Sequence, residues 1–170
     1  MIFTLIGMPG AGKSCMGKYV SRKLGLPLID SDKLIEERFG KKLQVLLDEV
    51  GVDEFRRIEE EVLLSIDGDP DKNYILSTGG SAVYSKAGME HLRKKGKIIY
   101  LYCGCKNIIS RIKNPTDRGI VLKPGQTLED LFLERTPLYS SYADITFSVD
   151  GVAYSRYQNE LVKLISEEIE

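Results

Sequence analysis

A glycine-rich segment at residues 7–14 constrains this chain more than any other feature. It reads Gly-Met-Pro-Gly-Ala-Gly-Lys-Ser and matches the pattern G-x-x-x-x-G-K-[ST]. Residues 2–6 before it form a short β-rich apolar run, and residues 13–24 after it have a helical pattern. Because this motif works between a strand and a helix, the sequence predicts a phosphate-binding loop. A glycine turn before an ordinary helix is the alternative.

The expected loop has a direct physical rationale. Glycines let successive backbone N–H groups point inward, and the following helix adds positive potential at its amino terminus. Lys13 can then bridge the β- and γ-phosphates of a nucleoside triphosphate, and the Ser14 hydroxyl can ligate Mg²⁺. The nucleotide-binding residues expected in this segment are Gly10, Ala11, Gly12, Lys13, Ser14 and Cys15.

Apolar runs alternate with helical patterns along all 170 residues. Such alternation predicts an α/β fold in which helices cover both faces of a parallel sheet, as a three-layer α/β/α arrangement. The sequence has no linker or repeat that would divide it, so we expect one domain over residues 1–170. The five expected strands are residues 2–6, 26–29, 74–77, 97–102 and 144–149. The expected helices are residues 13–24, 31–39, 43–50, 52–66, 86–95, 106–113, 128–142 and 154–169.

Composition excludes several classes of protein. The 24 Lys+Arg and 25 Asp+Glu residues give a formal net charge of −1, which argues against nucleic acid as a partner. The longest purely apolar stretch, residues 98–103, is far shorter than the roughly 20 residues that cross a bilayer. No basic region precedes the apolar amino terminus, so a secretory signal is not expected either. We therefore expect a cytoplasmic protein with no membrane partner.

The cysteines support a reduced compartment. Three residues, Cys15, Cys103 and Cys105, are too few and odd in number for a disulfide framework. A structural zinc needs about four ligands, and His91 is the single histidine of the chain. Apolar filling at a strand end is therefore favoured over a zinc site for the Cys103–Cys105 pair.

Acidic residues after the second expected strand help to decide among three classes of nucleotide-binding protein, namely GTPases, ATPases and small-molecule kinases. A GTPase would carry an N-K-x-D signature, which is absent. An ATPase would place an acid at the end of an apolar strand, and the strands that end at Ser77 and Tyr102 are not followed by one. Instead, Asp30 and Asp32 follow residues 26–29, which suits a small-molecule kinase. Asp30 could hold Mg²⁺, and Asp32 could accept the proton of an attacking hydroxyl. Simple capping of the next helix is the alternative reading of this pair.

With these residues in place, the chain resembles the shikimate kinases. That family shows a phosphate loop, then D-[ST]-D, F-R-x-x-E on a helix, a glycine triplet, a lid arginine and R-x-P-L-Y. The corresponding segments occur here in the same order and with similar spacing, between residues 1 and about 149. They are Asp30-Ser-Asp32, Phe55-Arg-Arg-Ile-Glu59, Thr78-Gly-Gly80, Arg118 and Arg135-Thr-Pro-Leu-Tyr139.

The resemblance implies transfer of the γ-phosphate of ATP to the 3-hydroxyl of shikimate, with Mg²⁺, by a monomer. It also implies a P-loop kinase type of fold with a mobile lid at residues 114–125 and substrate-binding helices within residues 31–66. Lys13, Asp32 and Arg118 would be catalytic. Arg56 and Arg135 would clamp the substrate carboxylate, and Gly79 and Gly80 would let the substrate ring approach the backbone. Arg111 would stack on adenine. Ser14 and Asp30 would bind the metal.

Each arginine also has a simpler interpretation. Arg56 could belong to a solvated helix face with ion pairs, and Arg135 could pair with an acid at the surface. Arg118 lies in a polar loop, where exposure is the default, and Arg111 has the weakest signal of the four. Cys15, in the first turn of its helix, could be a thiol open to oxidation or alkylation, or it could serve simple packing.

Departures from the family pattern leave the acceptor open. Ser81 stands where the third glycine usually lies, and Arg118-Gly-Ile120 replaces the usual lid sequence R-P-L-L. Residues 150–153 lack the proline that often marks the adenine loop. Shikimate is the favoured acceptor, a different hydroxylated carboxylic or sugar acid is the first alternative, and a regulatory nucleotide-binding protein is the second.

Overall fold

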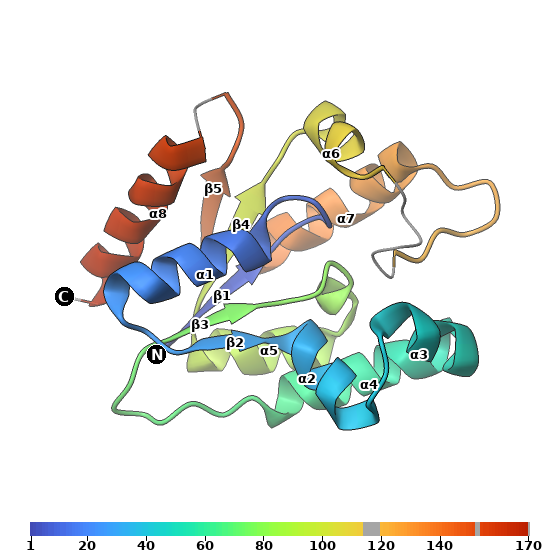
Figure 1. Ribbon diagram of the computed structural model, residues 1–170, viewed down its shortest axis with the longest axis horizontal. Helices are drawn as coiled ribbons and strands as arrows, with labels where there is room; N and C mark the ends of the chain where they lie inside the picture. The colour runs from blue at the N-terminus through green and yellow to red at the C-terminus, as the bar shows by residue number, and fades with distance from the viewer. Residues whose placement is uncertain (114–119, 152–153, 170) are drawn as a thin grey trace.

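The computed structural model describes residues 1–113, 120–151 and 154–169, with five parallel strands in one sheet. The strand order is β2-β3-β1-β4-β5, so the first strand lies at the centre (Figure 1). All five residues of this central strand are buried, which explains its nearly continuous apolar sequence. The strands are β1 (Ile2–Ile6), β2 (Leu28–Asp30), β3 (Tyr74–Ser77), β4 (Gly96–Tyr102) and β5 (Ile145–Ser148).

Helices cover both faces of the sheet and confirm the expected three-layer α/β/α architecture. Two helices, α1 and α8, pack against each other on one face, while α5 and α7 contact β4 from the other (Figure 1). Three more, α2, α3 and α4, contact one another beside the β2 edge of the sheet. The helices are α1 (Lys13–Leu24), α2 (Ser31–Phe39), α3 (Leu43–Val50), α4 (Val52–Ser65), η1 (Ala82–Tyr84, 3-10), α5 (Lys86–Lys95), α6 (Cys105–Arg111), α7 (Leu128–Tyr142) and α8 (Tyr154–Ile169).

The boundaries differ from those expected at a few positions. The second strand begins at Leu28 because Pro27, which has no N–H, takes part only through its carbonyl, as the acceptor from Ile75 N. The helix after β4 is Cys105–Arg111 rather than residues 106–113. A short 3-10 turn, Ala82–Tyr84, lies in a segment for which no helix was expected.

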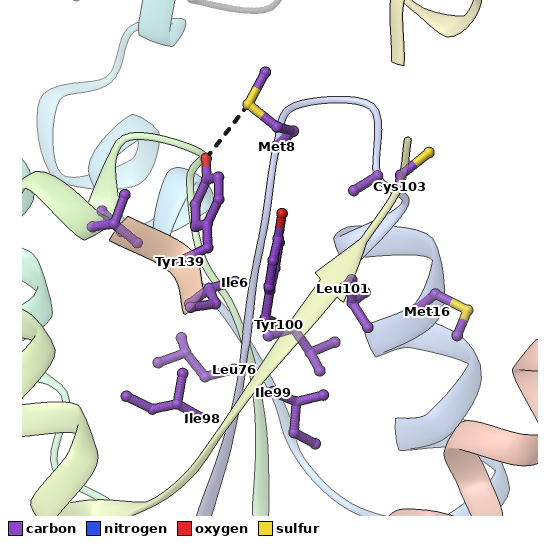
Figure 2. Packing of buried hydrophobic residues seen from close by; sticks show 14 of the residues in the cluster. Ile6, Met8, Met16, Leu76, Ile98, Ile99, Tyr100, Leu101, Cys103 and Tyr139 are labelled. Atoms are coloured by element: carbon purple, nitrogen blue, oxygen red, sulfur yellow. Dashed lines mark hydrogen bonds between the residues drawn. The ribbon is translucent and has the colours of Figure 1, made fainter. Parts of the chain in front are cut away.

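Two stacked tyrosines join the core to the loop above it. The rings of Tyr100, in β4, and Tyr139, in α7, lie 5.1 Å apart between centroids. The Tyr139 hydroxyl points toward Met8 Sδ at 3.9 Å, as Figure 2 shows, and donates a hydrogen bond to Gly80 O at 2.6 Å. The core therefore holds the loops after β1 and β3 in fixed relative positions.

The expected lid falls partly outside the described residues. Residues 114–119, including Arg118, are not among them. Of the remainder, Ile120 is buried and packs into the main core cluster. In the part of the chain that is described, no helix has the length and apolar character that crossing a bilayer would require.

Candidate active site

A cavity of about 780 Å³ lies at the carboxyl ends of the strands. Parallel sheets bind their ligands at this edge because the loops after neighbouring strands meet there. The loop after β1, the start of α2 and the loop after β3 all contribute to its wall. Ten of the residues expected to form the site line it: Gly10, Gly12, Lys13, Ser14, Cys15, Asp32, Gly79, Gly80, Arg111 and Arg135.

The loop after β1 curls around its own lysine. Gly10 and Gly12 have φ angles of 82° and 94°, which side-chain-bearing residues rarely adopt. Lys13 Nζ donates hydrogen bonds to Gly7 O at 2.8 Å and to Met8 O at 3.0 Å, and the residue is 8% exposed. The ammonium group therefore lies inside the curl, where a phosphate group would meet it together with the N-terminus of α1.

The Asp30 side chain caps α2 and also reaches the loop. Its Oδ1 accepts hydrogen bonds from Asp32 N at 3.1 Å and Lys33 N at 3.3 Å. Its Oδ2 accepts from Ser14 Oγ at 3.4 Å, and Ser14 Oγ is also 3.4 Å from Ser77 Oγ at the end of β3. The capping interpretation of Asp30 is thus correct, and the same carboxylate also lies beside the Ser14 hydroxyl.

This group of oxygens fits Mg²⁺ and not zinc. Hydroxyl and carboxylate oxygens are hard ligands of the kind that Mg²⁺ prefers, with water and phosphate filling the remaining positions. Among residues 1–113, 120–151 and 154–169, no three or more His, Cys, Asp or Glu side chains are grouped to hold a metal by themselves. Burial raises the pKa of the Cys103 thiol to about 11, which fits the expected apolar role of this residue.

Asp32 faces the cavity in an environment that favours its protonated form. Burial raises the pKa of its carboxyl to about 6, against the opposing effect of the Lys13 charge. The neighbouring charges of Asp30 and Glu36 add to the increase. A carboxylate with a pKa near 6 is ionised at neutral pH and still basic enough to accept a proton.

A second buried carboxylate, Glu59 of α4, closes the F-R-x-x-E motif but had no expected role at the site. It is 2% exposed, lines the cavity and accepts hydrogen bonds from Ser81 Oγ at 3.0 Å and 2.8 Å. Burial raises its pKa to about 7, with Ser81 and the charges of Arg135 and Arg56 opposing the increase. Its position in sequence could have revealed it, because Glu59 is four residues after Phe55 and falls on the apolar face of its helix.

The two expected clamp arginines both contact one aromatic ring, that of Tyr84. Arg135 of α7 is 3% exposed and lines the cavity, and its Nε donates a hydrogen bond to the Tyr84 hydroxyl at 3.2 Å. The guanidinium carbon of Arg56 lies 4.2 Å from the centroid of the Tyr84 ring, and that of Arg135 lies 5.2 Å from it. Arg56 is not among the cavity-lining residues, so only Arg135 reaches the cavity wall.

The opposite end of the cavity is more open. Arg111 donates a hydrogen bond from Nη1 to Gly10 O at 3.2 Å and lines the cavity together with Cys15 and Tyr157 of α8. Cys15 is exposed, so the simple packing interpretation of this residue is not supported. Tyr157 was not expected at the site. Ala11, within the loop, is buried and is not among the cavity-lining residues.

Known proteins are similar to this chain in both sequence and structure. The family model described as shikimate kinase matches residues 9–166. A shikimate kinase of Paracidovorax citrulli is 38% identical over 146 residues, which cover 85% of this chain and 80% of the relative. One from Haemophilus influenzae is 37% identical over 164 residues, covering 95% and 90%. The structure of shikimate kinase from Acinetobacter baumannii in complex with shikimate matches with a TM-score of 0.84 at 30% identity, covering 98% of this chain and 93% of the other. Similarity of this extent, added to a cavity that joins a phosphate loop to a buried carboxylate and arginine, places the chain in the shikimate kinase family.

Proposed function

We propose that this protein transfers the γ-phosphate of ATP to the 3-hydroxyl of shikimate and releases ADP and shikimate 3-phosphate. The observation that carries the proposal is that Lys13, Asp32 and Arg135 line a single cavity. A cation for the phosphates, an acceptor for a hydroxyl proton and a buried cation for a carboxylate are the groups that this reaction needs. The structure of the Acinetobacter baumannii relative in complex with shikimate supports the choice of acceptor.

Each step of the reaction follows from these side chains. The backbone N–H groups of residues 10–15 and the Lys13 ammonium hold the β- and γ-phosphates and offset the charge on the transferring group. Asp32 orients the attacking hydroxyl and takes its proton as the new O–P bond forms. Arg135 binds the carboxylate of the acceptor and fixes the ring against the backbone of Gly79 and Gly80.

The metal site is proposed from the same oxygens. Ser14 and Asp30 would hold Mg²⁺, Ser14 directly and Asp30 through water. When bound, Mg²⁺ neutralises charge on the β- and γ-phosphate oxygens.

The remaining expected roles are also proposals. Arg111 stacks on adenine, and Arg118, outside the described residues, closes over the phosphates and keeps water out. Arg56 joins Arg135 at the acceptor carboxylate, which requires its guanidinium to move from the Tyr84 ring toward the cavity. We further propose a cytoplasmic, monomeric enzyme of one domain, with substrate-binding helices in residues 31–66 and no nucleic-acid or membrane partner.

One observation favours a related acceptor as the second candidate. Ser81 lines the cavity with a hydroxyl group at a position where the family usually has bare glycine backbone. An acid with a different arrangement of hydroxyls could use this group. The second candidate is therefore a kinase of the same fold that acts on another hydroxylated carboxylic or sugar acid.

A coupled assay of ADP release over a panel of acceptors tests the proposal. The panel contains shikimate, quinate, gluconate and a control without acceptor. We expect turnover with shikimate to exceed the others. Turnover with another acid alone would support the second candidate, and tight ATP binding without turnover on any acid would indicate a regulatory protein.

A further inference from the structure

We propose that Ser81 and Glu59 form a second hydroxyl-binding subsite beside Asp32, which selects acids that carry another hydroxyl near the one that is phosphorylated. The inference rests on the proposed function, because it concerns the acceptor of the same transfer. It assigns a role in specificity to Ser81, the residue that departs from the family pattern.

The hydrogen bond between the two side chains is the first observation. Ser81 Oγ lies 3.0 Å from Glu59 Oε1 and 2.8 Å from Oε2, so its single proton is shared between both oxygens. This contact fixes the carboxylate at the cavity wall, which both residues line. The Ser81 oxygen keeps its own lone pairs, so it can also accept a hydrogen bond.

The second observation is that the Glu59 carboxylate has hydrogen-bond acceptor positions that no donor among the described residues fills. An ionised carboxylate can accept about four hydrogen bonds, and within the described part of the chain the donor to Glu59 is Ser81 alone. The residue is 2% exposed, so bulk water supplies few of the others. A ligand hydroxyl that donates to this carboxylate would satisfy a buried acceptor.

The position of Gly79 shows what shape of ligand fits. A methyl group added there would lie 2.6 Å from Asp32 Oδ1 and 2.9 Å from Glu59 Oε1, so the two carboxylate oxygens face one small space. An acceptor above this backbone can therefore reach Asp32 with one hydroxyl and Glu59 with a neighbouring one. The ligand class is a ring acid with at least two hydroxyls close together.

Charge explains why the serine hydroxyl matters. Burial and the nearby Asp32 charge raise the pKa of Glu59, whereas Ser81, Arg135 and Arg56 lower it. Loss of the Ser81 hydroxyl would shift Glu59 toward its protonated form, which has fewer lone pairs to offer a ligand. Ser81 thus acts through Glu59 as a positioning residue.

The test compares shikimate with its 4-deoxy and 5-deoxy analogues in the wild type, Ser81→Ala and Ser81→Thr. The backbone at Ser81, with φ −89° and ψ −6°, accepts both substitutions without strain. We expect the wild type to lose about 10-fold or more in kcat/KM on at least one analogue, as for a hydrogen bond to a charged group. In Ser81→Ala, kcat/KM for that analogue should lie within about 3-fold of the value for shikimate. In Ser81→Thr, which keeps the hydroxyl, the wild-type difference should return.

Ser85→Ala is the matched control. Ser85 Oγ also donates to a glutamate of α4, Glu60 Oε2 at 2.5 Å, but neither residue lines the cavity. This variant should keep the discrimination of the wild type, even if its unfolding temperature falls. Ser81→Gly replaces Ser81→Ala if the latter does not fold, as judged by circular dichroism.

Two results would overturn the subsite. One is a wild type that uses both deoxy analogues as well as shikimate, and the other is full discrimination in Ser81→Ala. Failure of the proposed function gives a different result, namely no shikimate-dependent ADP release by the wild type. The same comparison is then made with the acid that is phosphorylated and its deoxy analogue, with the same two results overturning the subsite.

Discussion

The Tyr84 hydroxyl accepts a hydrogen bond from Arg135 Nε at 3.2 Å, and the tyrosine ring contacts the guanidinium groups of both this arginine and Arg56. A ring face attracts cations, so one aromatic side chain offsets the repulsion between two like charges. The same hydroxyl donates to Glu134 Oε2 at 2.8 Å. Tyr84 therefore fixes the direction of Arg135 from both the ring and the hydroxyl.

Substitutions of Tyr84 should act on binding of the acid and not on the chemical step. We expect Tyr84→Phe to raise KM for shikimate by about 3-fold and Tyr84→Ala by about 10-fold, with kcat within about 2-fold of the wild type. Steady-state kinetics with both substrates varied would measure this. Tyr142→Ala, which removes a similar contact with Arg93, should change neither constant. A fall in kcat with unchanged KM would contradict the positioning role.

Lys13→Met should remove phosphoryl transfer while leaving the protein folded. The lysine charge is the group aimed at the transferring phosphate, so we expect kcat to fall by roughly 100-fold or more. Lost hydrogen bonds to Gly7 O and Met8 O should lower the free energy of unfolding by about 1–2 kcal/mol. Lys18→Met on the exposed side of the same helix is the control. Comparable turnover by the two variants would refute the role of Lys13.

The pH profile should report the ionisation of Asp32. The carboxylate, and not the acid, accepts the hydroxyl proton, and its pKa is raised to about 6. We therefore expect kcat/KM to fall by about 10-fold for each pH unit below about 6. Measurement in buffers of constant ionic strength from pH 4.5 to 8 would show this limb. A rate that stays constant down to pH 5 would exclude Asp32 as the proton acceptor.

Asp32→Asn should make the protein inactive and more stable at alkaline pH. The carboxyl has a pKa of about 6 when folded against 3.8 in the unfolded chain, so its ionisation opposes folding above pH 6. Its replacement should raise the free energy of unfolding by roughly 1–3 kcal/mol at pH 8. The gain should decrease as pH falls from 6 and vanish below 3.8, where both states are protonated. Urea unfolding at pH 8 and pH 3.5 tests the sign, and an equal gain at both would contradict it.

Two substitutions of Asp30 can separate its role in capping α2 from its proposed role in binding the metal. Serine caps helices nearly as well as aspartate, so Asp30→Ser should keep stability within about 0.5 kcal/mol of the wild type. The lost charge should raise the Mg²⁺ concentration for half-maximal activity by about 10-fold. Asp30→Ala should lose about 1 kcal/mol of stability in addition. Titration of Mg²⁺ in the ADP-release assay measures the first effect, and an unchanged requirement in Asp30→Ser would exclude Asp30 from the metal site.

Local patterns predicted most of the fold. The five strands were identifiable because buried parallel strands are short apolar runs, and the helices because their apolar residues recur with helical spacing. The phosphate loop was identifiable because its glycines have a backbone requirement, which the left-handed φ angles of Gly10 and Gly12 confirm. Element ends were less accurate, as at Pro27, because single contacts between strands decide them.

Parts of the site depend on contacts between distant segments and were not predicted. Tyr84 meets Arg135 across 51 residues, and Tyr139 meets Gly80 across 59. The family pattern places two arginines together, but no local pattern predicts that both contact one tyrosine ring. Likewise, the sequence marks Ser81 only as a departure from the family pattern, because its bond to Glu59 depends on the packing of α4 beside the residues that follow β3.

The third strand lies between β2 and β1 in the sheet, although it follows both in the sequence (Figure 1). The first 66 residues of the chain thus contain the phosphate loop, both aspartates and Glu59. They lack β3, the strand that lies between the strand before the phosphate loop and the strand that leads into the aspartates. Residues 74–77 must insert between two strands that are already synthesised before Ser14, Asp30 and Ser77 can meet. Catalytic competence is therefore a property of the completed sheet and of no amino-terminal fragment that lacks β3.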